Sequence, residues 1–189
     1  MPGKARSAWQ GQVREIHVKL AASAISRTLP FLLTGFIIAA DQVTKTIVAS
    51  RLLLARPVEV LGDFLRFTYV LNPAVAFSLG RKLPSHIQRI VFFLLPLLVL
   101  CIVLLYYFLS HDLTNGQRWA LAAILGGGSG NLLDRLVRSG GVVDFIDVKF
   151  YGILGFARFP TFNLADSSVS VAGLFLIFSF LRHELRREQ

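Results

Sequence analysis

The stretch Ile90–Leu109, IVFFLLPLLVLCIVLLYYFL, contains twenty consecutive residues without a charge. A helix needs about 20 mostly apolar residues to cross the hydrocarbon core of a bilayer, so this stretch alone predicts a membrane-spanning helix. Pro96 lies near its beginning, where a membrane helix tolerates a kink. The whole chain agrees, because 54% of its 189 residues are hydrophobic and only 16% are charged. This balance excludes a disordered chain and argues against a water-soluble globule.

Three further segments are apolar but interrupted by polar residues. Together with the first they predict four spans, at roughly 29–49, 88–109, 118–136 and 162–181. The first segment could also be a cleaved signal peptide. Cleavage after Ala40 would make a leader of about forty residues, however, where about 15–30 is typical. The expected fold is therefore an all-α membrane protein with four transmembrane helices.

The segments between these spans contain short runs typical of β-strands. Residues 57–61 and 64–70 flank Gly62-Asp63, a pattern that predicts a hairpin. Residues 142–148 form another such run after a glycine pair. We expect a small β-rich cap on the face of the membrane opposite the termini, which is the periplasmic face if the termini are cytoplasmic.

Polar residues inside the expected spans form three pairs at helical spacing. An ionisable side chain in the bilayer costs about 2.5–3.5 kcal/mol on insertion scales, so it is a functional-site hypothesis by default. Hydrogen bonding between helices is the alternative explanation, and it yields only about 0.6 kcal/mol on average. Self-neutralisation near the interface is a further alternative for the first pair. The pairs are Asp41 with Lys45, Asn131 with Asp134, and Asn163 with Asp166.

Carboxyls are the reactive groups that the chain offers. Two carboxyls held close together share a proton and can activate a water molecule for attack on a carbonyl. The candidates are Asp134, Asp144, Asp147 and Asp166. Asp144 and Asp147 would face opposite sides of a strand, so one of the two would point at the site, and the spacing does not say which.

Metal and nucleic-acid partners are not expected. The chain has one cysteine and four scattered histidines, and none of them has a second ligand at metal spacing. The net charge of +9 is explained by lysines and arginines that flank membrane segments, so no nucleic-acid partner is needed. We therefore expect no metal and no cofactor.

Five motifs in order give the sequence a specific resemblance. They are DQVTK at 41–45, NPAVAFS at 72–78, GNLLDR at 130–135, VVDFI at 142–146 and FNLADS at 162–167. This order resembles the lipoprotein signal peptidases (signal peptidase II), which are aspartic peptidases of the bacterial inner membrane. Where the family usually has Asn-x-Gly-Ala-Ala-Phe, this chain has Ala74 and Val75, which puts the role of Asn72 in doubt. The link from Arg135 to Asp144 is one residue longer than in common forms.

The resemblance implies a role for each matching residue. It makes Asp144 and Asp166 the catalytic pair, in preference to Asp147. It implies that Asp134 fixes Arg135 or neighbouring groups. Supporting or substrate-binding roles fall to Asp41, Lys45, Asn72, Asn131, Asp134, Arg135 and Asn163.

The same resemblance implies the function, partners and location. The expected reaction removes the signal peptide from diacylglyceryl-modified prolipoproteins, just before the lipidated cysteine. Membrane lipid and globomycin-type inhibitors are further expected partners, and the chain is expected to act as a monomer. We expect a basic cytoplasmic extension at 1–28, a membrane peptidase domain at 29–182 with periplasmic insertions at about 50–87 and 137–160, and a cytoplasmic tail at 183–189.

Charge counts do not decide the orientation of the chain. If both termini are cytoplasmic, nine of the twenty lysines and arginines lie on that side and eleven on the other. The density of arginines near the C-terminus favours cytoplasmic termini and an active site near the periplasmic face.

Two functions of other classes compete with a peptidase. A small proton-coupled transporter or channel would also need ionisable residues in the membrane. Four spans are few for a transporter, and no inverted repeat is visible. A scaffold that binds anionic lipid through basic tails would explain the charge but not the carboxyls inside the spans.

Overall fold

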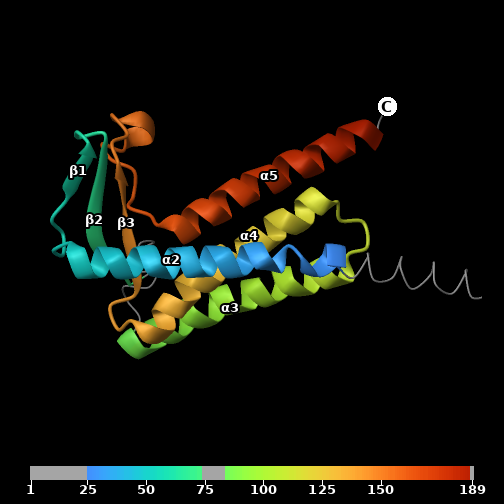
Figure 1. The fold of residues 1–189 in the computed structure, drawn as a ribbon, viewed down its shortest axis with the longest axis horizontal. Helices are drawn as coiled ribbons and strands as arrows, with labels where there is room; N and C mark the ends of the chain where they lie inside the picture. Colours follow the sequence, from blue (N-terminus) through green and yellow to red (C-terminus); the bar gives the residue numbers. More distant parts are fainter. Residues whose placement is uncertain (1–24, 74–83, 188–189) are drawn as a thin grey trace, which may run out of the picture.

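The computed structural model describes residues 25–73 and 84–187. Four long helices run along one another, and a small sheet lies at one end of them (Figure 1). Each long helix coincides with one of the four predicted spans, and α5 continues beyond the predicted end at 181. The elements in chain order are α2 (Phe31–Arg51), β1 (Val58–Leu61), β2 (Leu65–Asn72), α3 (Ser85–Leu109), α4 (Asn115–Val137), β3 (Val142–Val148), the short 3-10 helix η2 (Ile153–Gly155) and α5 (Leu164–Arg187).

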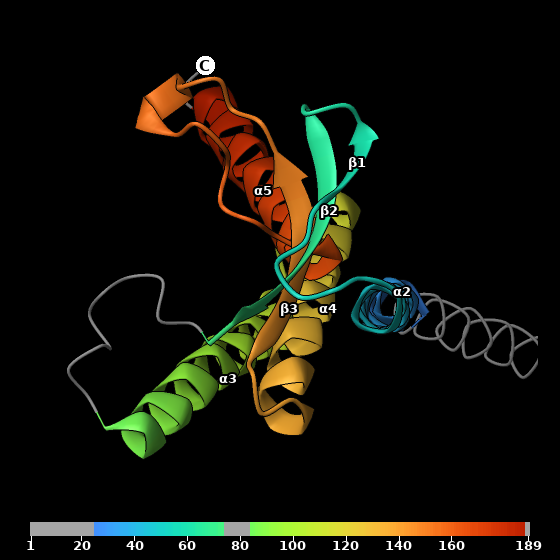
Figure 2. The same cartoon turned by 90° about the vertical axis from the view of Figure 1, so that its left-hand side faces the viewer.

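Helix α4 lies at the centre of the bundle. It contacts α2, α3 and α5, and the view along the bundle shows the other three helices arranged around it (Figure 2). Small residues allow this close approach, because a Cβ at Gly126 would come within 3.0 Å of the Ile37 Cβ. A Cβ at Gly130 would come within 2.7 Å of a carboxylate oxygen of Asp41. The glycines of α4 therefore bring the polar face of α2 against the central helix.

Local sequence signals explain where the helices begin. Pro30 precedes α2, and Pro84 precedes α3, where a missing N–H costs nothing. Thr114 begins α4 with a capping box, in which its hydroxyl accepts from the Gln117 N–H and the Gln117 side chain accepts from the Thr114 N–H.

The outer surface of the bundle is apolar. On α3, Leu94, Leu95, Leu98, Ile102 and Leu105 are each more than half exposed, as expected for side chains that face lipid. Within the described residues, three helices are long and apolar enough to cross a membrane. They are Ile25–Arg51, Ile90–Leu109 and Leu164–Arg182. This confirms a membrane-protein fold with three apolar helices and a small sheet.

Helix α4 is the predicted span that does not belong to this apolar group. It is 23 residues long, which is enough to cross a bilayer, but it contains Arg118, Asp134 and Arg135. Arg118 and Asp134 are buried inside the bundle. A central helix packs against protein on most sides, so its low hydropathy follows from its position.

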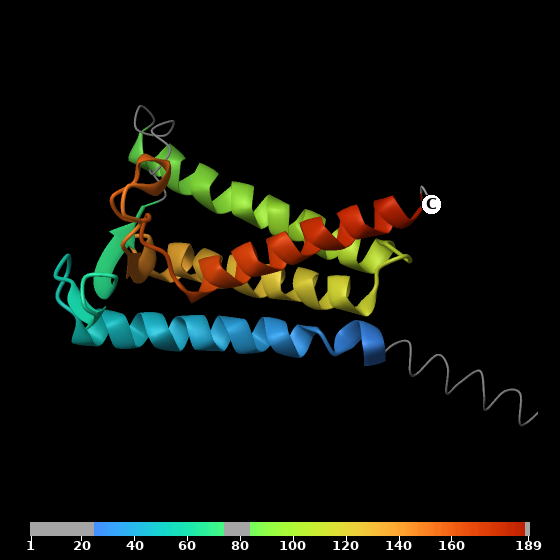
Figure 3. The same cartoon turned by 90° about the horizontal axis from the view of Figure 1, so that it is seen from above.

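The sheet has three antiparallel strands in the order β1-β2-β3. The predicted hairpin forms around Gly62, whose positive φ of 50° suits the turn, and β3 has the predicted bounds. A core of Val48, Val143 and Phe145 joins the end of α2 to β3. The sheet lies beside the end of α2 and the beginning of α5 (Figure 3). The strand that carries Asp144 is thereby held against the helices that carry the other polar residues.

Candidate active site

Lys45 is the centre of a buried charge cluster on the inner face of α2. Its ammonium group lies 2.7 Å from Asp41 and 3.0 Å from Asp134, and all three side chains are fully buried. The ammonium also donates to Oδ1 of Asn131 over 2.8 Å. These three contacts use all three donors of the lysine. The predicted pairing of Asp41 with Lys45 is confirmed, and the pair is buried inside the bundle with a second carboxylate.

Asp134 accepts four hydrogen bonds, which fill the capacity of a carboxylate. Two come from α2, from Gln42 over 3.1 Å and from Lys45. The others come from Arg138 over 3.1 Å and from the backbone N–H of Val143 over 3.0 Å. Asp134 therefore joins α2 and α4 to β3, at the residue that precedes Asp144. Its arginine partner is Arg138 rather than Arg135.

Asn131 links Lys45 to Asp166 through two hydrogen bonds. Because Oδ1 of Asn131 accepts from Lys45, the amide nitrogen of Asn131 must point the other way. That nitrogen donates to Oδ1 of Asp166 over 2.7 Å. The hydrogen bond from Lys45 thus fixes the orientation of the Asn131 side chain, and Asn131 in turn orients the Asp166 carboxyl.

Asn163 and Asp166 form a capping box at the beginning of α5. The Asn163 side chain accepts from the backbone N–H of Asp166 over 2.9 Å, and the Asp166 carboxyl accepts from the backbone N–H of Asn163 over 3.1 Å. Asp41 satisfies another N–H of this first turn, that of Ala165, over 3.1 Å. The spacing Asn163-x-x-Asp166 thus forms the cap of α5 and also places both residues in the candidate site.

Asp144 is held by two amides on the inner side of β3. Asn163 donates to one of its oxygens over 2.8 Å, and Asn72 donates to the other over 2.9 Å. Asp144 is only 2% exposed. Asn163 therefore contacts both carboxyls: its side-chain amide donates to Asp144, and its backbone N–H donates to Asp166.

Burial raises the pKa of Asp144 from 3.8 to about 6. The negative charge of Asp166 adds to this rise of the pKa, whereas the hydrogen bonds from Asn72 and Asn163 oppose it. A buried carboxyl beside a like charge favours its protonated form.

Asp147 lies among cations on another part of the cap. Arg66 stands opposite Asp147 in the β2–β3 register and donates to it over 2.9 Å. Arg158 donates to its other oxygen. Arginines hold Asp147, whereas the amides of Asn72 and Asn163 hold Asp144. This arrangement separates two carboxyls that spacing alone left equivalent.

Arg135 differs from the other predicted residues because its guanidinium is only partly satisfied. One Nη donates to the backbone carbonyl of Asn131 over 3.1 Å. Its buried Nε has no hydrogen-bond partner among residues 25–73 and 84–187. The carboxyls of Asp166 and Asp144 act on it electrostatically, with Asp166 acting more strongly.

The departures from the family motif at Ala74 and Val75 lie outside the described residues.

Two contributors were not predicted from the sequence, Gln42 and Arg138. Arg138 follows Asp134 by four residues, the same acid-to-base spacing as in Asp41 and Lys45, so helical spacing could have identified it. Gln42 also donates to the carbonyl of Gly130 over 3.0 Å, a contact between helices that a one-dimensional pattern does not reveal.

Over residues 25–73 and 84–187, no group of three or more histidine, cysteine, aspartate or glutamate side chains is placed to hold a metal ion. In the charge cluster, the two carboxylates of Asp41 and Asp134 already bind the Lys45 ammonium.

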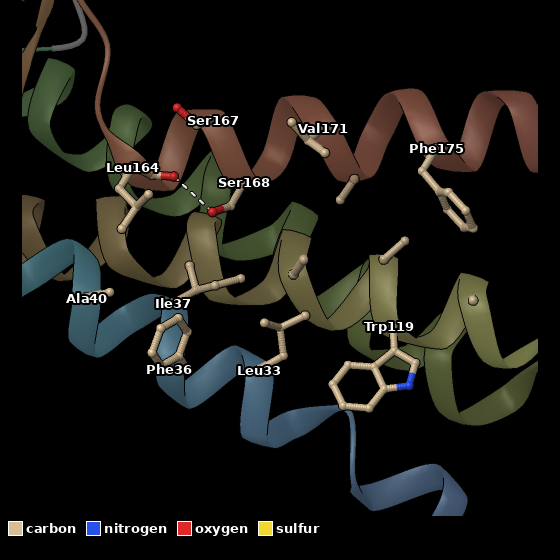
Figure 4. Close-up of a pocket in the computed structure, with 14 residues that line it drawn as sticks. Leu33, Phe36, Ile37, Ala40, Trp119, Leu164, Ser167, Ser168, Val171 and Phe175 are labelled. Atoms are coloured by element: carbon tan, nitrogen blue, oxygen red, sulfur yellow. Dashed lines mark hydrogen bonds between the residues drawn. The ribbon is translucent and has the colours of Figure 1, made fainter.

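A separate apolar groove of about 640 Å³ lies between α2, α4 and α5. Leu33, Phe36, Trp119, Val171 and Phe175 line it (Figure 4). The hydroxyls of Ser167 and Ser168 bond to carbonyls of their own helix and so offer little to a polar ligand. None of the candidate site residues lines this groove.

Comparison with known proteins agrees with this fold. The solved structure of a bacterial membrane enzyme, determined by the in meso method at 1.9 Å resolution, superimposes with a TM-score of 0.69. It is 29% identical in sequence and covers 81% of this chain and 92% of its own. A second such structure, at 2.3 Å, gives the same TM-score. The fold is therefore that of a helical membrane enzyme.

Sequence relatives identify the family. A protein of Treponema pallidum named lipoprotein signal peptidase is 40% identical over 168 residues, which are 88% of this chain and 90% of that protein. One of the same name from Treponema denticola is 48% identical over 146 residues, 77% of this chain and 84% of that protein. The sequence profile described as Signal peptidase (SPase) II matches residues 33–182. The chain belongs to the signal peptidase II family of aspartic peptidases.

Proposed function

We propose that this protein is an aspartic endopeptidase that removes signal peptides from diacylglyceryl-modified prolipoproteins, cleaving before the lipidated cysteine. In this proposal Asp144 and Asp166 form the catalytic pair. One observation supports it above all: Asn163 binds both carboxyls, although they belong to a strand and a helix 22 positions apart in the sequence. The names of the relatives supply the substrate class.

The chemistry requires two neighbouring carboxyls with one proton between them. One carboxylate accepts a proton from water as the water attacks the scissile carbonyl, and the other carboxyl protonates the carbonyl oxygen. The tetrahedral species then collapses as the leaving nitrogen takes a proton. The buried position of Asp144 raises its pKa to about 6, which favours retention of the shared proton up to about that pH.

The surrounding residues have supporting roles in this proposal. Asp41, Lys45 and Asp134 hold α2, α4 and β3 together, Asn131 and Asn163 orient the carboxyls, and Asn72 binds Asp144 from β2. Arg135 has donors that the described protein groups leave unused, which suits contact with a substrate carbonyl.

In the proposed topology, all four long helices cross the bacterial inner membrane, with α4 as the fourth span. The beginning of α2 and the end of α5 lie at the end of the bundle opposite the sheet, which supports termini on one side (Figure 1). We place the termini in the cytoplasm and the carboxyls near the periplasmic face, where the modified substrates are. The membrane peptidase domain spans 29–182, with a basic extension at 1–28, insertions at about 50–87 and 137–160, and a tail at 183–189.

The proposed partners follow from this substrate class. They are diacylglyceryl prolipoproteins, surrounding lipid and globomycin-type cyclic peptide inhibitors. A single chain supplies both carboxyls and the amides that hold them, which supports action as a monomer.

The test compares three isosteric variants in detergent with a purified diacylated prolipoprotein. Asp144→Asn and Asp166→Asn should each reduce cleavage at least 1,000-fold, as about 4 kcal/mol of lost transition-state stabilisation would. Asp147→Asn is the matched control on the same strand and should retain most activity. All three should elute as folded monodisperse protein. Loss of activity in Asp147→Asn with activity kept in Asp144→Asn would reverse the assignment.

A further inference from the structure

The two carboxyls of the pair have different structural environments, although each accepts two hydrogen bonds. Asp166 is the only acid in the first turn of α5. It accepts from the Asn163 backbone N–H in the capping box and from the Asn131 side chain. The beginning of a helix carries about half a positive charge from its aligned peptide groups. This position favours the ionised form of Asp166.

Asp144 lies on a strand, and the beginning of α5 reaches it through the side-chain amide of Asn163 rather than through a backbone N–H. It is 2% exposed and forms no salt bridge within the part of the chain that the structure describes. Its hydrogen bonds come from the neutral amides of Asn72 and Asn163. Each of its oxygens accepts one amide N–H, which leaves a lone pair available for a proton.

The neighbouring charges increase this difference. Three of them act on Asp144: Asp166 from α5, Lys45 from α2 and Arg135 from α4. Lys45 has all its donors engaged by Asp41, Asp134 and Asn131. Arg135 acts more strongly on Asp166 than on Asp144. Arg135 therefore stabilises a negative charge on Asp166 more than one on Asp144.

We infer that in the resting enzyme Asp166 is the carboxylate that deprotonates the attacking water and Asp144 is the carboxylic acid that protonates the scissile carbonyl. This assignment rests on the proposed function, which names the two residues as a pair but not which of them carries the proton. The capping box at α5 and the buried strand position of Asp144 carry the assignment.

The proton and electron balance of the reaction closes with these roles. The water oxygen forms a bond to the carbonyl carbon, and its proton moves to Asp166. The carbonyl π bond breaks, and its oxygen takes the proton of Asp144 to give a neutral diol. Asp166 then protonates the leaving nitrogen as the C–N bond breaks, while a diol hydroxyl returns its proton to Asp144. The products leave with both carboxyls in their starting forms.

Infrared spectroscopy of the purified enzyme tests the location of the proton without turnover. Protein labelled with ¹³C-aspartate should lose a labelled carboxylic-acid C=O band as the pH rises from about 4 to about 8, with a midpoint above that of ordinary aspartates. Asp144→Asn should abolish this late-titrating band. Asp166→Asn should keep the band with a lower midpoint, because the negative charge that opposes ionisation of Asp144 is removed.

A second pair of variants keeps both charges and the cap. Glutamate is the usual partner in a capping box, so Asp166→Glu removes the label from that position but preserves the carboxyl. The labelled band should persist in Asp166→Glu and disappear in Asp144→Glu. Loss of the band in the Asp166 variants but not in the Asp144 variants would overturn the assignment, and so would a band whose amplitude is unchanged in both Asp144 variants. Because the readout needs no substrate, a failure to cleave prolipoprotein would contradict the proposed function alone.

Discussion

Replacing Lys45 by methionine should destabilise the protein more than any exposed charge substitution. Lys45 and Arg138 balance the charges of Asp41 and Asp134, and methionine would leave one negative charge in excess. Removing one partner of a buried ion pair costs about 3–5 kcal/mol. At about 1.4 kcal/mol for each factor of ten, the folded-to-unfolded ratio should fall by about two to three and a half orders of magnitude.

The assay is denaturation of purified protein in one detergent, followed by the circular dichroism of the helices. Arg66→Met is the matched control, because Arg66 pairs with Asp147 and Asp63 at a partly exposed position and should cost about 1 kcal/mol or less. Adding Asp41→Asn to Lys45→Met should recover part of the loss, since the excess charge is removed. A Lys45→Met protein that is no less stable than Arg66→Met would show that the buried ion pair does not stabilise the fold.

Three further predictions concern pH, reagents and topology. The alkaline limb of kcat/KM should follow the pKa of Asp144, which is about 6 before substrate binds, because activity is lost as that proton leaves. Asn72→Ala removes a hydrogen bond that lowers the pKa of Asp144, so the alkaline limb should move to higher pH. A shift of this limb to lower pH would contradict the prediction. Metal chelators, serine-directed reagents and thiol-blocking reagents should leave cleavage unchanged, and Cys101→Ala should be active; inactivation by a chelator that zinc reverses would argue against an aspartic mechanism. In intact cells carrying Cys101→Ala, a cysteine at Ser110 should resist impermeant thiol reagents and one at Ser139 should react, whereas the opposite labelling would invert the proposed topology.

The sequence by itself determined the features that depend on composition and local pattern. The uncharged stretch of α3 and the β-prone run of β3 follow from side-chain solvation and backbone preference, so their bounds could be predicted closely. The pairing of Asp41 with Lys45 follows from helical geometry. The family motifs added Asp144 and Asp166 as the expected catalytic pair, which spacing alone did not decide.

Only the tertiary structure decided which polar groups share an environment. Asp144 and Asp147 occupy the same strand, but packing of β3 beside β2 places Arg66 and Arg158 against Asp147 and leaves the amides for Asp144. These contacts join segments about 80 residues apart in one case and 11 in another, so no local signal could predict all of them.

The structure also gives Asp134 and Asp144 different environments. Asp134 fills its hydrogen-bonding capacity with Gln42, Lys45, Arg138 and the backbone of β3, so it holds elements together. Asp144 keeps a lone pair free on each oxygen and has only neutral donors. Both are aspartates in or beside an apolar segment, and the sequence records their identity but not their partners. The physical reason is that hydrogen-bond saturation is a property of the packed bundle, which forms only when α2, α4, α5 and β3 meet.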